Sequence, residues 1–430
     1  MIGSVRGAPL FVEPAGDTPL VWFDISIGGG ASADPMGIEG SHRHAALLAR
    51  RGAGGRDRAA LDEALDALGA NVDVALGRDA VTVSGLCLSK NLDAVVDLVA
   101  DILAAPRFDQ DEHARLLRET PQILDEIRDD DSALATRWFD WACCPGHPYG
   151  RTSLGTEASL AGIELAAVAA QWRAEVVPRN LVIGVAGDVT PGRGEALAGR
   201  LVERLVDGAA PAQAALGTTS TSARRLYLVD KADRTQAQLR LGHLSARFGE
   251  PDTAALLIAE TAFGGMFSSR LMQEIRVKRG WSYGAGCALR RSRGRHWFEM
   301  WMATAIEVAA PAVALTHELY AELAERGPRA DEIELARSYL LGAMPFHTAT
   351  ARQRMQLAVR DAVFGLPPGY SAELPRAVGA ITADEVRAAC QRHLHPDQLV
   401  TVAVTTAADT HAGFDQAGLG PISTVRFDEY

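Results

Sequence analysis

Two histidines lie close together in GSHRHAALLARRG, residues 40–52, and histidine pairs of this kind can bind a metal ion. A helix presents two histidines to one zinc ion when they are four positions apart, because that spacing places both imidazole rings on one face. His42 and His44 are only two positions apart, so in a helix their side chains point about 200 degrees away from each other. We therefore predict solvated or half-buried histidines that share no metal ion.

Arg276 and Tyr283 form a second candidate pair, seven residues apart within FGGMFSSRLMQEIRVKRGWSYGAGCAL, residues 263–289. A phenol can donate a hydrogen bond to a developing oxyanion, and a guanidinium can hold carbonyl or carboxylate oxygens in a fixed fork. The spacing alone also fits a purely structural interpretation. In that case Arg276 lies near a helix C-terminus, where the helix dipole favours a positive charge, and Tyr283 is a strand aromatic beside Gly284.

The composition limits the possible classes of protein. The chain has 430 residues, of which 47% are hydrophobic and 23% charged, and this is typical of a soluble globular protein with two or more domains. The net charge of −11 argues against a nucleic-acid partner. The five cysteines form no CxxC pair and no disulfide framework, so we expect a reducing, cytoplasmic location. Neither a signal peptide nor a membrane span is expected, because no sufficiently long apolar run occurs.

The chain repeats itself faintly about a central linker. Residues 208–223 are small, polar and uncharged, which is typical of a linker. VPRNLVIGVAG at 177–187 aligns with HPDQLVTVAVT at 395–405, and PRFDQDEHARLL at 106–117 aligns with PRADEIELARSY at 328–339. The nearly constant offset predicts a duplicated fold with one domain at 1–207 and another at 224–430. Two generic helix–turn–strand units remain the alternative.

The elements of the first half appear in groups. Residues 19–28 alternate, with Phe23, Ile25 and Ile27 on one face and Asp24 on the other, which predicts a half-buried strand. The remaining pattern predicts helices at 38–51, 56–69, 90–104, 109–127 and 132–142, a hairpin at 72–88 and a strand at 180–187. Because strands and helices are grouped, we predict an α+β fold, in which each domain has helices on one face of a mostly antiparallel sheet.

The run GSHRHAALLARRGAGGRDRAALDEALDALGANVDV, which begins at Gly40, resembles the inverted zinc peptidases of the insulinase, pitrilysin and mitochondrial processing peptidase type. In that family the helix contains His-x-x-Glu-His, whose histidines bind zinc and whose glutamate activates water. An alignment on Gly40 and Gly52 puts Arg43, Ala46 and Leu47 at these three positions. The resemblance therefore implies a lost zinc site in this chain, with the position of the third ligand near Asp125 or Glu126.

The resemblance covers essentially the whole chain and includes GHPYGRTSLGT at 146–156. It implies that the two half-repeats form one half of a clam-shell, completed by a second subunit or a fused second copy. It also implies roles for Arg276 and Tyr283, which match the second-half signature of the family. The tyrosine reaches the zinc site of the other half and bonds to the scissile carbonyl oxygen, and the arginine holds the substrate nearby.

These observations predict a non-zinc subunit of a heterodimeric metallopeptidase, inactive alone. The expected partner is a homologous chain that carries the zinc, and the expected substrates are unfolded peptides. Bacterial pairs of this kind exist in the family. Two alternatives remain: a catalytically inert structural subunit, like the core subunits of the respiratory bc1 complex, and an independent peptide-binding protein.

Overall fold

The computed structural model describes residues 3–211 and 223–429, which form two compact units. The first unit comprises Met1–Ile123, Arg151–Ala215 and Pro345–Ser371, and the second comprises Leu124–Gly150, Leu216–Met344 and Ala372–Tyr430. The units differ from the predicted domains 1–207 and 224–430 because each half of the sequence contributes one segment to the other unit. The predicted linker falls mainly on residues 212–222, which lie outside the described residues.

Each unit contains a six-stranded sheet, and five strands of the two sheets follow the same order, β2-β8-β3-β7-β6 in the first and β9-β13-β10-β12-β11 in the second. The first sheet has the order β1-β2-β8-β3-β7-β6 and the second has the order β11-β12-β10-β13-β9-β14. In both sheets one parallel pair, β2 with β8 or β9 with β13, adjoins an otherwise antiparallel run. The second sheet also adds β14 in parallel to β9. This recurrence confirms the predicted duplication and the mostly antiparallel sheets.

The strands of the first sheet are β1 Gly3–Val5, β2 Ala8–Pro14, β3 Leu20–Gly28, β6 Asn71–Leu76, β7 Ala80–Leu88 and β8 Leu181–Gly187, and β4 Gly52–Ala53 and β5 Arg56–Asp57 form a separate small ribbon. Those of the second are β9 Arg225–Asp230, β10 Gln236–Arg247, β11 Ala285–Arg290, β12 Arg295–Ala305, β13 Val400–Thr405 and β14 Ile422–Arg426.

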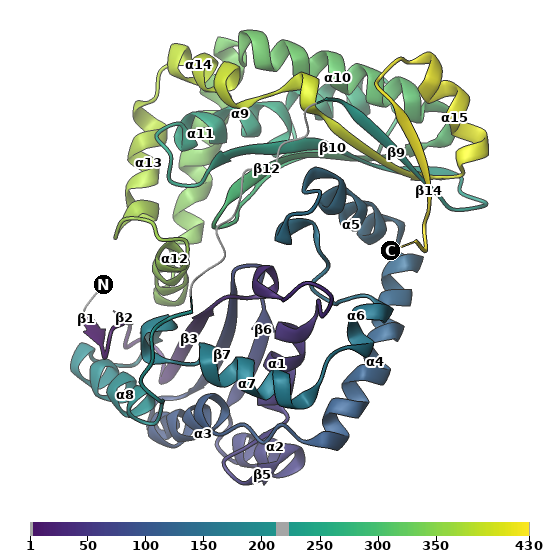
Figure 1. Ribbon diagram of the computed structural model, residues 1–430. Helices are drawn as coiled ribbons and strands as arrows, with labels where there is room; N and C mark the ends of the chain where they lie inside the picture. The colour runs from purple at the N-terminus through teal and green to yellow at the C-terminus, as the bar shows by residue number, and fades with distance from the viewer. Residues whose placement is uncertain (1–2, 212–222, 430) are drawn as a thin grey trace. The chain divides into compact units, whose positions relative to one another are not determined.

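Helices cover these sheets (Figure 1). The helices from the first half of the sequence are α1 Ser41–Arg50, α2 Arg58–Ala67, α3 Leu92–Ala104, α4 Gln110–Asp129, α5 Asp131–Cys143, α6 Glu157–Ala161, α7 Leu165–Glu175 and α8 Pro191–Glu203. Those from the second half are α9 Thr253–Glu260, α10 Ala309–Arg326, α11 Ala330–Ala343, α12 Ala351–Val363, α13 Tyr370–Ala380, α14 Ala383–His393 and α15 Ala407–Gln416. The predicted α+β fold is therefore confirmed, but the prediction of helices on only one face of each sheet was incomplete, because α12 and α5 lie on the other faces.

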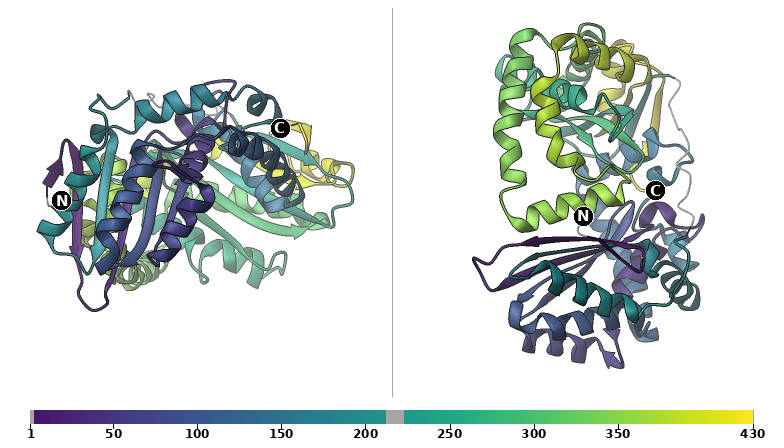
Figure 2. Two further views of the ribbon diagram at one scale, coloured as in Figure 1. Left: turned by 90° about the horizontal axis from the view of Figure 1, so that it is seen from below. Right: turned by 90° about the vertical axis from the view of Figure 1, so that its left-hand side faces the viewer.

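Helix α12 packs on the face of the first sheet that the sequence pattern predicts to be solvated (Figure 2, right). A Cβ atom on Gly184 of β8 would lie 2.3 Å from the sulfur of Met355, so this glycine allows α12 to approach the strand closely. Asp24 is consequently buried, and burial raises the pKa of its carboxyl group although Gln356 of α12 bonds to it. The prediction of a half-buried strand was wrong, because its polar face is covered by a helix from the other half of the sequence.

Helix α5 covers the corresponding face of the second sheet. Trp138 and Phe139 of α5 pack in one apolar cluster with Trp297 of β12 and with valines of β13. A polar contact also holds α5 against the sheet, since the guanidinium of Arg240 on β10 donates to the hydroxyl of Ser132 on α5 at 2.8 Å. The other helices of this unit contribute to the cluster on the opposite face. Each sheet therefore has its main helical layer on one face and a single helix from the other half of the sequence on the other.

Candidate functional site

The helix α1, which carries the altered zinc positions, is fixed at its N-terminus by Asp34. The Asp34 carboxylate accepts hydrogen bonds from the backbone N–H of Gly40 at 2.7 Å, the Ser41 hydroxyl at 2.8 Å and the backbone N–H of His42 at 2.9 Å. Gly40 has a φ of 94°, a left-handed conformation that favours glycine. Asp34 therefore satisfies donors at the helix start that no helical carbonyl can reach.

His42 is buried between two carboxylates. Its Nδ1 lies 2.7 Å from Asp34 Oδ1, its Nε2 lies 2.7 Å from Glu175 Oε1 at the end of α7, and its exposed fraction is 2%. Burial alone would lower the pKa of the imidazole, but the bonds to Asp34 and Glu175 outweigh it and raise the pKa to about 9. The prediction of a solvated or half-buried His42 was therefore wrong, because the chain brings Glu175 from a distant position to this ring.

His44 is also buried, and it lies in a different environment. Its ring packs edge-on against His113 of α4 at a centroid distance of 4.9 Å. Burial, together with the neighbouring His113, lowers the pKa of His44 to about 4, so this imidazole is neutral at physiological pH. The two histidines thus face different partners, His42 an acidic pair and His44 a second histidine. The prediction that His44 is solvated or half-buried was wrong for the same reason as for His42, since long-range packing covers it.

We expect the charge of His42 to make the stability of the protein depend on pH. A folded-state pKa above the unfolded value of about 6.5 gives stability that is fully present below pH 6.5 and is lost as the pH rises through about 9. The corresponding loss in the free energy of unfolding is at most about 3 kcal/mol. Urea unfolding at a series of pH values measures it. The loss should be absent from His42→Gln and present in His411→Gln, which alters an exposed histidine. A wild-type pH dependence in His42→Gln would contradict the expectation.

The three positions that correspond to the zinc motif cannot form a metal site. Arg43 donates from Nη1 to the hydroxyl of Thr120 on α4 at 3.2 Å, Ala46 is buried, and Leu47 is half-buried. A guanidinium has no lone pair for a metal ion, and alanine and leucine have no donor atom. Within residues 3–211 and 223–429, no group of three or more histidine, cysteine, aspartate or glutamate side chains is placed to hold a metal ion.

The side chain of Arg43 bonds to Thr120 of α4. The two carboxylates at the predicted position of the third zinc ligand, by contrast, are exposed. Thr120 is fully buried and donates its own hydroxyl to the Leu116 carbonyl at 2.8 Å. Asp125 pairs with Arg128 on the surface, and Glu126 is exposed. A hydroxyl of threonine thus lies where α4 meets the altered positions of α1.

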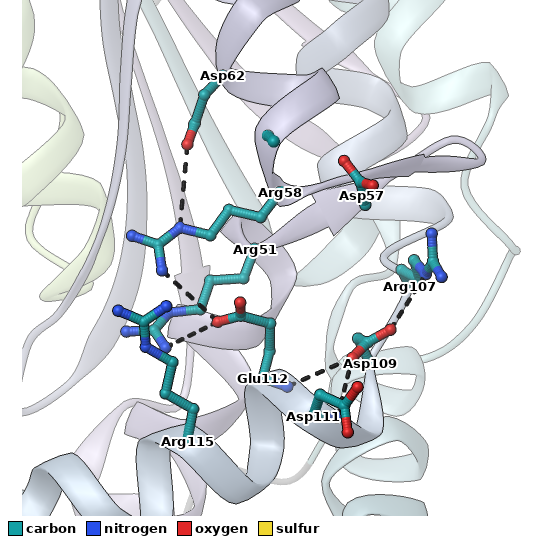
Figure 3. A pocket seen from close by; sticks show the side chains of 10 residues that line it. Arg51, Asp57, Arg58, Asp62, Arg107, Asp109, Asp111, Glu112 and Arg115 are labelled. Atoms are coloured by element: carbon teal, nitrogen blue, oxygen red, sulfur yellow. Dashed lines mark hydrogen bonds and ion pairs between the residues drawn. The ribbon is translucent and has the colours of Figure 1, made fainter.

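A hollow of about 570 Å³ beside the end of α1 is lined by charged side chains that pair with one another (Figure 3). Arg51 lies 3.0 Å from Glu112, and Arg58 lies 3.6 Å from the same carboxylate. Asp109 accepts from the backbone N–H of Asp111 at 2.9 Å, at the start of α4. These ion pairs tie α1 and α2 to α4, so we assign them a structural role.

In the second unit, the segment that carries Arg276 and Tyr283 is held by close backbone packing. It contains two π-helical turns, Thr261–Gly265 and Met272–Val277, and such turns often occur at functional sites. A Cβ atom on Gly264 would lie 2.3 Å from the backbone nitrogen of Cys287 in β11, so only glycine fits there. The buried Arg270 forms a fork with Glu332 of α11, with distances of 3.0 and 2.5 Å.

The side chains of Arg276 and Tyr283 have few contacts with the rest of this segment. The guanidinium of Arg276 lies over the ring of Phe267, 4.9 Å from its centroid, and has no ion-pair partner among the described residues. Tyr283 is 93% exposed and lies two residues before the start of β11 at Ala285. A structural tyrosine would pack its ring against the sheet, so this exposure favours a role in binding. Arg276 does lie in the last turn of Met272–Val277, as the structural interpretation also expects.

No helix within residues 3–211 and 223–429 is both long enough and apolar enough to cross a lipid bilayer. The duplicated α+β fold and the Arg276/Tyr283 segment are the features expected from the resemblance to the inverted zinc peptidases. The three positions of α1 that correspond to the zinc motif lack atoms that could bind the metal.

Two models of one family match the chain. The model described as Insulinase (Peptidase family M16) matches residues 15–156, and the model described as Peptidase M16 inactive domain matches residues 163–340. The chain belongs to this family, the M16 or insulinase family, which confirms the resemblance predicted from its motifs. The segment with Arg276 and Tyr283 lies within the second match.

Some of the similar proteins are named as proteases and others as inactive homologues. An uncharacterised zinc protease of Mycobacterium tuberculosis is 29% identical over 78% of this chain and 77% of its own length. The non-peptidase homolog YmxG of Helicobacter pylori is 22% identical over 73% of this chain and 72% of its own. A crystal structure described as a peptidase M16 inactive domain from Pseudomonas fluorescens has a TM-score of 0.87 and 24% identity, covering 94% of this chain and 96% of that one. The last comparison supports the fold alone.

Sequence patterns did not reveal the Asp34–His42–Glu175 cluster. Asp34 lies only eight residues before His42, so a capping aspartate could have been suspected from the sequence. Glu175 lies 133 residues after His42, and no local signal connects the two.

Proposed function

We propose that this chain is the non-zinc subunit of a heterodimeric metallopeptidase. A homologous partner would carry the zinc ion and its ligands, and this chain would supply Arg276 and Tyr283 to the partner's site. The observation that carries the proposal is the contrast between the two motifs. The zinc positions hold Arg43, Ala46 and Leu47, whereas Arg276 and Tyr283 keep the family spacing. Tyr283 is exposed, and the half-buried Arg276 has no acidic partner among the described residues.

Two further features support the proposal. Arg276 has no acidic partner among the described side chains, so its N–H groups are available to carbonyl or carboxylate oxygens of a peptide. The five cysteines are buried thiols, which agrees with the reducing, cytoplasmic location proposed for the complex.

A catalytically inert structural subunit is the second candidate, and the name of the Helicobacter relative, a non-peptidase homolog, favours it. Such a subunit would need only its folded surface. The two candidates differ in one respect, because only the first requires a working hydroxyl on Tyr283 and a working guanidinium on Arg276.

The test begins with the purified chain alone. We expect no stoichiometric zinc by elemental analysis and no cleavage of unstructured peptides. Mixed with a family member that keeps His-x-x-Glu-His, the chain should form a stable complex with a large interface, roughly 1,600 Å² or more, and cleave peptides in a chelator-sensitive reaction. One tightly held zinc ion per chain that is lost in His42 or His44 variants, or chelator-sensitive cleavage by the chain alone, would overturn the proposal.

A further inference from the structure

Trp301 of β12 lies on the same face of the second sheet as α5, beyond the part that α5 covers. Side chains alternate along a strand, so Trp297, Glu299 and Trp301 share one face. Trp297 packs against α5, and Glu299 pairs with Arg240, which bonds to Ser132 of α5. The indole of Trp301, by contrast, is 42% exposed. This strand therefore presents a large aromatic ring on an otherwise covered face.

The indole of Trp301 rests on two glycines of the neighbouring strand segment. A Cβ atom would lie 2.8 Å from Cζ2 of Trp301 if built on Gly286, and 3.6 Å from Cζ3 if built on Gly284. Gly286 is paired directly with Trp301 in the sheet. One side of the six-membered ring therefore lies against glycine backbone, and Gly284 directly follows Tyr283 in the chain. The aromatic platform thus borders the exposed tyrosine of the proposed site.

The charged neighbours of Trp301 on this face are paired with one another. Arg240 lies opposite Trp301 in the sheet, and its Nε lies 3.2 Å from Glu299 Oε1. Glu299 also pairs with Arg290 at 2.6 Å. Exposed tryptophan rings can bind cations, but the nearby carboxylate already has two guanidinium partners and would not support one. A large uncharged side chain fits an apolar ring whose charged neighbours are already paired.

We propose that Trp301 is a specificity-determining residue, whose exposed indole binds a large uncharged side chain, aromatic or aliphatic, of an extended peptide. The inference rests on the proposed function and deepens it. Arg276 and Tyr283 would hold the peptide backbone, and Trp301 would select which side chain lies beside them. The substrates would then be unfolded peptides with a residue such as phenylalanine or leucine near the bond that the partner cleaves.

Binding to the full-length chain tests the inference without a partner. The probes are three fluorescein-labelled peptides that share one Gly/Ser host sequence and carry phenylalanine, alanine or lysine at the central position. Fluorescence anisotropy should show the phenylalanine peptide binding roughly tenfold or more tightly than the alanine peptide, because burial of such a side chain is worth about 1.5–3 kcal/mol. The lysine peptide should show no gain over alanine.

Variants of the chain then test whether the indole of Trp301 causes the preference for the phenylalanine peptide. Trp301→Ala should bring the phenylalanine and alanine peptides to nearly equal affinity, and Trp301→Phe should keep part of the preference. Tyr339→Ala is the matched control, since Tyr339 on α11 is 49% exposed and belongs to the helical layer on the opposite face of this sheet. Thermal unfolding verifies that each variant is folded.

Three results would overturn the inference: no phenylalanine preference in the wild type, a preference that survives Trp301→Ala, or one that Tyr339→Ala abolishes equally. Failure of the proposed function has a different signature. A Trp301-dependent preference without hydrolysis in any complex would keep the binding subsite and remove the catalytic role. Hydrolysis of all three peptides at rates that Trp301→Ala does not change would keep the catalytic role and remove the binding subsite.

Discussion

Replacing Tyr283 by phenylalanine is expected to lower the kcat of the complex with a zinc-bearing partner by roughly 10- to 1000-fold. The upper part of this range, roughly 100- to 1000-fold, is the usual effect of removing one hydrogen-bond donor from an oxyanion site. The substitution removes a single hydroxyl from a side chain that is 93% exposed, so neither folding nor assembly should change. KM should change little, because the bond to the oxygen strengthens only as negative charge develops on it. Steady-state kinetics on complexes of verified stoichiometry give both constants.

Tyr339→Phe supplies the matched control for the tyrosine. Tyr339 is a second exposed tyrosine of the same unit, carried by α11, and loss of its hydroxyl should leave kcat unchanged. If Tyr283→Phe complexes turn over at the wild-type rate, the structural-subunit alternative gains the support that the catalytic proposal loses. If the variant fails to assemble, Tyr283 is an interface residue and its proposed chemistry is wrong.

Replacing Arg276 by alanine is expected to raise KM, by roughly 10- to 150-fold, with a smaller effect on kcat. A hydrogen bond from a charged donor contributes about 1.5–3 kcal/mol, and a group that holds substrate in both the ground and transition states acts mainly on KM. Arg276→Lys should recover only part of the affinity, because an ammonium group cannot reproduce the planar fork of a guanidinium. The measurement is the substrate dependence of the rate for each complex.

Arg279 offers a close control for Arg276. Its guanidinium lies over the ring of Trp281 at 5.4 Å, much as that of Arg276 lies over Phe267 at 4.9 Å, but Arg279 is already paired with Glu274. Arg279→Ala therefore removes a stacked arginine without removing an open guanidinium, and KM should stay within about twofold of wild type. Equal rises in KM for both variants would point to a general loss of positive charge rather than to a specific contact at Arg276.

The local elements could be predicted from the sequence because their signals lie within a few residues of one another. The alternation along 19–28 predicts β3, the hairpin predicted at 72–88 is β6 and β7, and the helices predicted at 90–104 and 109–127 are α3 and α4. The motif positions follow in the same way, since Arg43, Ala46 and Leu47 are fixed by their distance from Gly40 and Gly52. The absence of zinc ligands at these three positions of α1 is a property of the side chains, whatever the fold.

The tertiary structure decided which faces are covered and which charges meet. The sequence pattern predicts a solvent-facing Asp24. The residue is buried because α12, which lies more than 300 positions later in the sequence, packs over it. His42 reads as an ordinary histidine, and it is charged because Glu175 of α7 completes its acidic pair. Nothing in the sequence distinguishes Trp301 from other strand aromatics. It is exposed because α5 covers only the part of this sheet face that contains Trp297. Sequence patterns record the periodicity of a strand or helix, whereas burial and pKa depend on neighbours that only the folded chain brings into contact.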